Sequence, residues 1–115
     1  MKYSIVGLDQ MLLNCPSCDE CATHHIAVNA VERFNEDDKK GTSVIVRGHH
    51  VSFSSDAEKY NMSNRRGSVS IRFTCEFGCD DFLISFVQHK GATQIESMVL
   101  NGAGCSWFDE KARPC

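Results

Sequence analysis

The sequence lacks any long apolar run. No stretch of it approaches the roughly 20 consecutive apolar residues that a membrane-spanning helix needs. Residues 1–9 also lack the extended apolar core of a secretory signal. We therefore expect a cytoplasmic protein that does not enter a membrane.

The chain is equally poor in excess charge of either sign. Its 115 residues include 12 lysines and arginines against 15 acidic residues, which gives a formal net charge of -3. That balance supplies no global attraction to nucleic acid or to an anionic membrane surface, so such binding would need a local basic patch. Hydrophobic residues make up 42% of the chain, which is ordinary for a globular protein. The length fits a single domain over residues 1–115.

Recognisable catalytic motifs are absent from the sequence. It has no glycine-rich loop that would cradle a phosphate, no serine hydrolase elbow and no carboxylate pair suited to acid–base work. His49 and His50 stand between two cysteine pairs and are followed by Asn61 and Asn64, an order that resembles zinc-framed HNH nucleases. Gly48 stands where those nucleases have an acidic residue, and strand-like sequence follows where they have a helix. We therefore favour a non-enzymatic protein, with HNH-like cleavage as the weaker alternative.

Cysteine is the abundant reactive residue. The chain has seven cysteines, an odd number, and no export signal is visible, so metal binding is favoured over a disulfide framework. The segments Cys15–Cys18 and Cys75–Cys79 each place two thiols on a short turn, the arrangement in which a cysteine pair shares one zinc ion. We expect Cys105 and Cys115 to be free thiols. The predicted ligands of one structural Zn²⁺ are Cys15, Cys18, Cys75 and Cys79.

The two cysteine pairs are far apart in the chain, with residues 19–74 between them. Because loop closure scales only logarithmically with length, the separation costs about 1 kcal/mol more than in a compact ribbon. Structural zinc contributes about 10 to 16 kcal/mol in small peptides. Cys21, His24 and His25 lie beside the first pair and are the alternative ligands for one corner of the site. Four cysteines would leave no open position for an activated water, which indicates a structural ion.

The pattern of apolar residues predicts β-structure. Val69, Ile71 and Phe73 alternate strictly with polar residues, as in a half-buried strand. The charged segment 35–41 and the polar segment 54–64 are predicted to be loops. We predict strands at residues 25–34, 42–46, 50–53, 68–74 and 82–88, and residues 93–100 are the candidate for a further strand. The expected fold is mainly β, an antiparallel sheet of about five strands held together by the zinc-ribbon-like four-cysteine site. The alternative is an α+β fold, because residues 25–34 also fit helical spacing.

Arginine provides a local concentration of positive charge. Arg65 and Arg66, with Arg72 nearby, could bind phosphate or an acidic partner. Acidic residues lie close by, among them Asp80 and Asp81, so surface ion pairs would equally account for these arginines. Nucleic acid is therefore the alternative partner. The candidate binding residues are Arg65, Arg66, His49 and His50.

Five stretches of the chain resemble a group of short, uncharacterised zinc-ribbon-like proteins of bacteria and their phages. They are residues 15–18, 23–25, 65–67, 75–79 and 88–93, and the Arg65-Arg66-Gly67 stretch is among the most distinctive. The resemblance covers about residues 15–95 and implies a metal and a mobile-element context, without an activity. We therefore expect a non-enzymatic, zinc-stabilised binding module, a phage or mobile-element accessory protein that acts on a host protein.

Overall fold

The fold is given by a computed structural model, in which residues 3–5 and 11–100 are described. This part of the chain contains strands and no helix, and therefore no helix that could cross a membrane. The eight strands are β1 (Tyr3–Ile5), β2 (Met11–Leu13), β3 (Thr23–Arg33), β4 (Lys40–Arg47), β5 (His50–Asp56), β6 (Ser68–Cys75), β7 (Phe82–His89) and β8 (Ala92–Val99). The mainly β fold expected from the sequence is confirmed.

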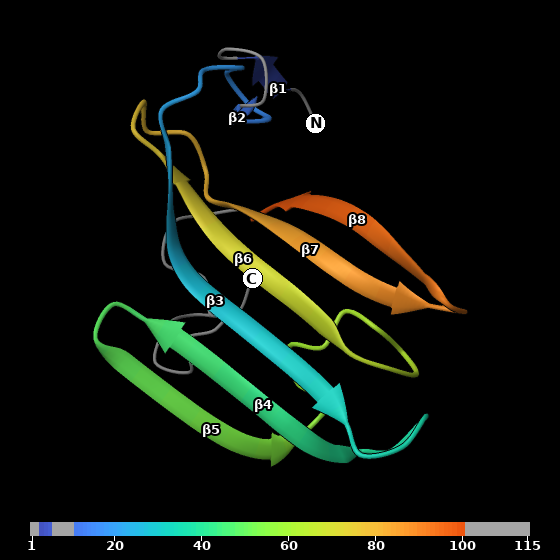
Figure 1. Ribbon diagram of the computed structural model, residues 1–115. Coiled ribbons are helices and arrows are strands. Elements are labelled where there is room, and N and C mark those ends of the chain that lie inside the picture. The colour runs from blue at the N-terminus through green and yellow to red at the C-terminus, as the bar shows by residue number, and fades with distance from the viewer. Residues whose placement is uncertain (1–2, 6–10, 101–115) are drawn as a thin grey trace.

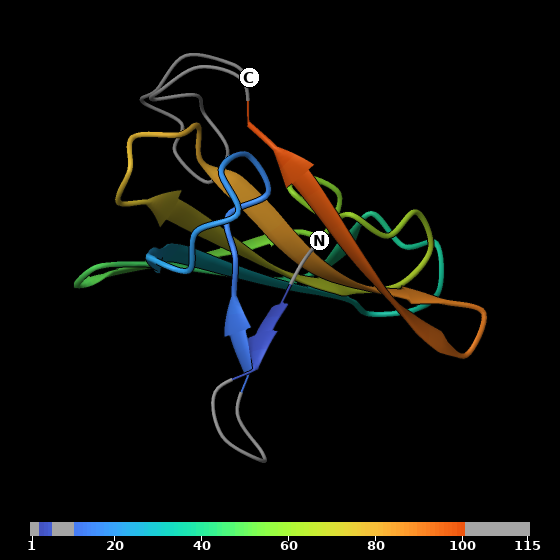
Figure 2. The ribbon, with the colours of Figure 1, turned by 90° about the horizontal axis from the view of Figure 1, so that it is seen from above.

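Six of the strands form one antiparallel sheet in the order β5-β4-β3-β6-β7-β8 (Figure 1). β1 and β2 form a separate two-stranded hairpin. Figure 2 shows this hairpin projecting from one side of the sheet, while the segment between β5 and β6 lies on the other side. Each predicted strand has its counterpart in the large sheet, although β5 continues through Ser54–Asp56, where the sequence predicted a loop.

The hairpin between β7 and β8 has the turn that its sequence favours. His89 pairs with Ala92, which leaves a two-residue turn of Lys90 and Gly91 between β7 and β8. Both turn residues have positive φ, 49° and 79°. Two consecutive positive φ angles give the turn a twist that matches the twist of the flanking strands, and glycine adopts such angles without steric cost. The turn thereby fixes the register of β8 on β7.

One face of the sheet is covered, and its buried centre is polar. Asn29, Ser70 and Ser85 are at most 1% exposed. The Ser70 and Ser85 hydroxyls lie 2.9 Å apart, and the Asn29 amide donates to the Tyr60 carbonyl at 3.1 Å. Tyr60 also packs against a buried cluster that contains Leu83. Hydrogen bonds within the protein offset the cost of this burial, because a buried polar group without a partner costs several kcal/mol.

The apolar residues that alternate with serines in β6, such as Val69, lie on the other face. Val69 is 39% exposed, whereas its neighbours Ser68 and Ser70 are buried. The same inversion occurs in β3, where Ile26 is 40% exposed and Asn29 is fully buried. The segment that follows β5 covers the polar face, so the face that alternation marks as the core side is the more open one.

Candidate metal centre

The topology of the sheet brings the two cysteine pairs together. β3 and β6 are antiparallel neighbours, and Thr23 at the start of β3 pairs with Cys75 at the end of β6. The segment before β3 and the turn after β6 therefore leave the sheet at the same end. The Glu76 amide donates to the Ala22 carbonyl at 3.0 Å and joins the two segments directly. The long separation of the pairs in sequence is spanned by strands of the sheet.

The four thiols are close enough to share one ion. The Sγ atoms of Cys15, Cys18, Cys75 and Cys79 all lie within 4.8 Å of one another. Cys18 Sγ and Cys75 Sγ are 3.6 Å apart. A tetrahedral zinc site with Zn–S bonds of about 2.3 Å places its sulfur atoms about 3.8 Å apart, so the observed spacing fits a single ion. The described cysteines are free thiols and form no disulfide among themselves.

Each cysteine pair is held by a turn with its own hydrogen bonds. In the first turn, the Ser17 amide donates to Cys15 Sγ at 3.4 Å and the Asp19 amide to the Cys15 carbonyl at 2.8 Å. In the second, the Gly78 amide donates to the Cys75 carbonyl at 3.2 Å. Gly78 has a φ of 81°, which a residue with a side chain rarely adopts. These turns orient the sulfur atoms toward a common point.

Apolar side chains lie beneath the thiols. Phe82 and Ile84 of β7 are buried and belong to the same cluster as Cys15 and Cys75. The ring of Phe82 stacks on that of Phe73, with centroids 5.3 Å apart. The sequence predicted a strand at residues 82–88 but not that Phe82 and Ile84 support the cysteines. The only hint is that Phe82 follows Cys79 closely.

A buried ion pair fastens the second cysteine turn to the sheet. Arg72 of β6 donates from Nε to Asp81 Oδ2 at 2.9 Å, and its Nη2 lies 2.8 Å from the same oxygen. The side chains are 8% and 21% exposed. Asp81 directly precedes β7, and its carbonyl accepts a hydrogen bond from the Leu100 amide at 2.8 Å. Arg72, considered from sequence as part of a basic face, therefore points into the protein.

The surroundings shift the pKa values of Cys15 and Cys79 in opposite directions. Burial acts to raise the pKa of Cys15, but hydrogen bonds from the Cys18 and Ser17 amides outweigh it and lower the pKa to about 7. The pKa of Cys79 is raised to about 12, first by its interaction with the Cys18 thiol and then by burial. One thiolate thus forms readily and opposes the formation of the next. A bound cation removes this opposition, because it stabilises all four thiolates together.

The three alternative ligands lie outside this group. Cys21 is exposed, and so are His24 and His25 at the start of β3. His24 Nε2 is 2.5 Å from Glu76 Oε1, so its ring is paired with a carboxylate. None of these three joins the cysteines among the described residues that could share an ion. Cys105 and Cys115 lie outside the part of the chain that the structure describes.

His49 and His50 lie at the turn between β4 and β5, and both are exposed. Arg47 pairs with His50, which makes Gly48 and His49 the two turn residues. Within the described part of the chain, neither histidine belongs to a group of three or more potential metal ligands. The structure therefore does not bring these histidines to the cysteine centre.

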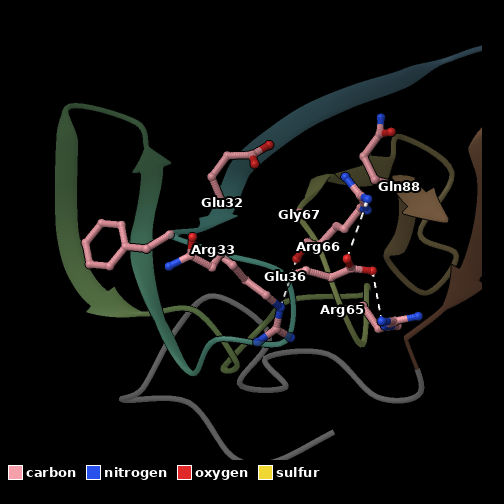
Figure 3. Close-up of a pocket in the computed structure, with 9 residues that line it drawn as sticks. Glu32, Arg33, Glu36, Arg65, Arg66, Gly67 and Gln88 are labelled. Carbon is pink, nitrogen blue, oxygen red and sulfur yellow. Dashed lines mark hydrogen bonds and ion pairs between the residues drawn. The ribbon is translucent and has the colours of Figure 1, made fainter. Parts of the chain in front are cut away.

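Arg65 and Arg66 line a pocket of about 390 Å³ between the ends of β3 and β7 (Figure 3). Arg65 lies 3.0 Å from Glu36 and 3.1 Å from Asp37, and Arg66 lies 3.8 Å from Glu36. These carboxylates raise the pKa of Arg65, with the hydrogen bond to Asp37 as the main cause. Arg33 in the same pocket donates to the Arg66 carbonyl at 3.0 Å. A phosphate would have to displace carboxylates from both exposed arginines.

Comparison of the chain with protein-family models, with curated proteins and with solved structures gave no match. The cysteine cluster is the group of described side chains whose arrangement most directly suits a chemical role, the binding of a metal ion.

Proposed function

We propose that the cysteine cluster holds one zinc ion, which stabilises the fold and takes no part in a reaction. The observation that carries the proposal is the donor set, four sulfur atoms within 4.8 Å of one another. Tetrahedral sites made only of thiolates suit zinc. Four protein ligands complete the tetrahedron, so the ion has no open position for water or substrate. The ligands are Cys15, Cys18, Cys75 and Cys79.

The ion would supply a large share of the stability. Structural zinc contributes about 10 to 16 kcal/mol in small peptides, and the total stability of a domain is only about 5 to 15 kcal/mol. The ion would also connect β3 and β6, the two central strands, at the end where both cysteine turns leave the sheet. Free thiols remain available to metal in a reducing compartment, which supports a place in the cytoplasm.

The protein as a whole is proposed to be a non-enzymatic binding module. A closed metal shell supports this role, because it provides a rigid surface and no reactive position. The resemblance to zinc-ribbon-like proteins of bacteria and phages supports an accessory role in which the module binds a host protein. Contact with a protein partner is favoured over nucleic acid because the carboxylates of Glu36 and Asp37 already engage Arg65 and Arg66.

The outer edge of β8 is the surface that we propose contacts the protein partner. β8 is an edge strand, and among the described strands only β7 pairs with it. All eight of its side chains are exposed, and Glu96 is its only charged residue. Natural edge strands usually carry lysine, proline or a bulge that prevents pairing with another chain. β8 has none of these, so an extended segment of a partner could add to the sheet at this edge.

Affinity capture from the lysate of a bacterial host tests this function. The zinc-loaded protein is compared with a Gln94→Lys/Glu96→Lys variant, which puts two lysines on the β8 edge. The control, Ser52→Lys/Glu58→Lys, makes the same change in charge on β5 and the turn after it, at the opposite edge of the sheet. We expect a host protein that is enriched by the wild type and the control and is lost from the β8 variant.

Two results would contradict the proposed function. One is that the zinc-loaded wild type enriches no host protein over bare resin. The other is that the β8 variant and the wild type enrich the same proteins, which would remove the β8 edge from the proposal. Where a partner is found and purified, its dissociation constants for the wild type and for the β8 variant can be compared directly. Lysines at an edge that is essential for binding should raise the dissociation constant at least about tenfold.

A further inference from the structure

The open face of the sheet is apolar across all six strands. The pairing register aligns two complete rows of side chains on this face, one from each strand per row. The first row is Phe53, Val44, Ala30, Val69, Phe86 and Ile95. The second row is Val51, Val46, Val28, Ile71, Ile84 and Ser97. We call these twelve residues the apolar face; none of them is charged, and only Ser97 is polar.

The apolar face is exposed to an extent that is unusual for such residues. Phe53 is 76% exposed, Ile95 61% and Val51 51%. Figure 1 looks onto this side of the sheet, and the segment between β5 and β6 passes behind the strands. At one end of this face the cysteine turns and Leu13 pack against β6 and β7, so Ile84 in the second row is only 6% exposed; the rest of the face is not covered by the described part of the chain. A sheet with one apolar face normally buries that face against a second layer.

We propose that a second copy of this chain covers the apolar face, so that two sheets pack face to face in a symmetric dimer. A face without charges meets no electrostatic repulsion from its own copy. Its first row is small at the centre, where Ala30 pairs with Val69, and large at the ends, at Phe53 and Ile95. A twofold axis along the strands would place the large residues of one edge over those of the opposite edge of the partner.

The area of the face agrees with a dimer of moderate affinity. Six strands about 4.8 Å apart and two rows about 7 Å apart cover on the order of 400 Å² of flat sheet in each copy. Protruding side chains such as Phe53 and Phe86 enlarge the accessible surface, so the total buried by two copies is roughly 1,000 Å², near the lower limit of specific interfaces. The β8 edge stays free in this arrangement, so the dimer and the proposed protein contact can fail independently.

Sedimentation equilibrium of the zinc-loaded full chain in reducing buffer tests the dimer. We expect the mean mass to rise from the 12.8 kDa of one chain toward twice that value between about 1 µM and 500 µM protein. The disrupting variant is Phe53→Lys, because the Phe53 side chain is too exposed to contribute to folding of the single chain. The matched control is Ser52→Lys, because Ser52 is its exposed neighbour on the same strand and points to the opposite face.

Phe53→Lys should raise the dissociation constant at least about tenfold, because it buries a charge in an apolar interface. Ile95→Lys, at the other end of the row, should do the same, and Ser52→Lys should leave the constant unchanged. Far-UV circular dichroism and zinc content confirm that each variant is folded. A wild type that stays monomeric up to about 500 µM would overturn the proposal. So would a dimer that persists in both disrupting variants, or one that Ser52→Lys disrupts equally.

Discussion

Removal of the Asp81 carboxylate should destabilise the protein more than most single substitutions. Arg72 is buried and holds Asp81 through two short contacts, of 2.9 and 2.8 Å. Asp81→Ala leaves the guanidinium inside the protein without this carboxylate. Breaking a buried ion pair in this way costs about 3 to 5 kcal/mol. Because the Asp81 side chain is 21% exposed and retains some hydration, we expect a value near the lower end, about 3 kcal/mol.

A double variant distinguishes the contribution of the ion pair from the cost of burying the Arg72 charge without the Asp81 carboxylate. Arg72→Met/Asp81→Ala removes both charges and keeps most of the buried volume, so it should cost only about 1 kcal/mol. Asp80→Ala is the matched control, because Asp80 is the exposed acidic neighbour, and it should change stability by less than about 0.5 kcal/mol. The free energy of unfolding is measured in urea by circular dichroism, with zinc in excess and thiols reduced.

The reasoning would be refuted by either of two outcomes. Asp81→Ala could cost less than about 1 kcal/mol, as expected of a solvated surface pair. Alternatively, the double variant could be as unstable as Asp81→Ala alone, which would mean that the packing around Arg72 matters and its charge does not. Zinc content should remain unchanged in all three variants, because neither Arg72 nor Asp81 belongs to the cysteine cluster.

Three further predictions follow from the site and its surroundings. His24→Ala removes an ion pair whose side chains are each 58% exposed. It should therefore lower the free energy of unfolding by less than about 1 kcal/mol and leave the zinc content unchanged. Loss of zinc would mean that His24 is a ligand. Ser70→Ala leaves the buried Ser85 hydroxyl without its partner and should cost about 1 to 2 kcal/mol in urea unfolding; Ser70→Ala/Ser85→Ala should cost no more, and a larger, additive loss would contradict the pairing. Metal affinity, followed with a chromogenic chelator, should rise with pH and fall as acid is added. The reason is that Cys79 must lose a proton to bind zinc, and its pKa is raised to about 12. Full retention of metal at about pH 4 would contradict thiolate ligation.

The strands and the cysteine pairs were predictable from sequence for local reasons. Alternation in residues 68–74 and the short turns around Cys15–Cys18 and Cys75–Cys79 depend on neighbours in the chain. The two pairs meet because Thr23 pairs with Cys75. That register follows from the order of strands in the sheet, which periodicity alone does not determine. The sequence could therefore suggest the four ligands but not the route by which they converge.

The burial of the two faces could not be predicted from alternation. Val69 and Phe86 have the composition of a core face, yet they are 39% and 37% exposed. Ser70 and Asn29 look like surface residues, yet they are buried because the segment after β5 covers them and provides hydrogen-bond partners such as the Tyr60 carbonyl. Which face a connecting segment covers is a tertiary choice. A period of two specifies only that the faces differ.

The most direct test of the four-thiolate centre is the zinc content of the purified chain and of its single serine variants. The wild type should contain one zinc ion per chain by mass spectrometry of the metal. Each variant of Cys15, Cys18, Cys75 or Cys79 should lose the ion and the cooperative unfolding transition, while Cys21→Ser should retain both. A wild type without bound zinc, or a Cys21→Ser variant that loses it while one of the four retains it, would contradict the centre.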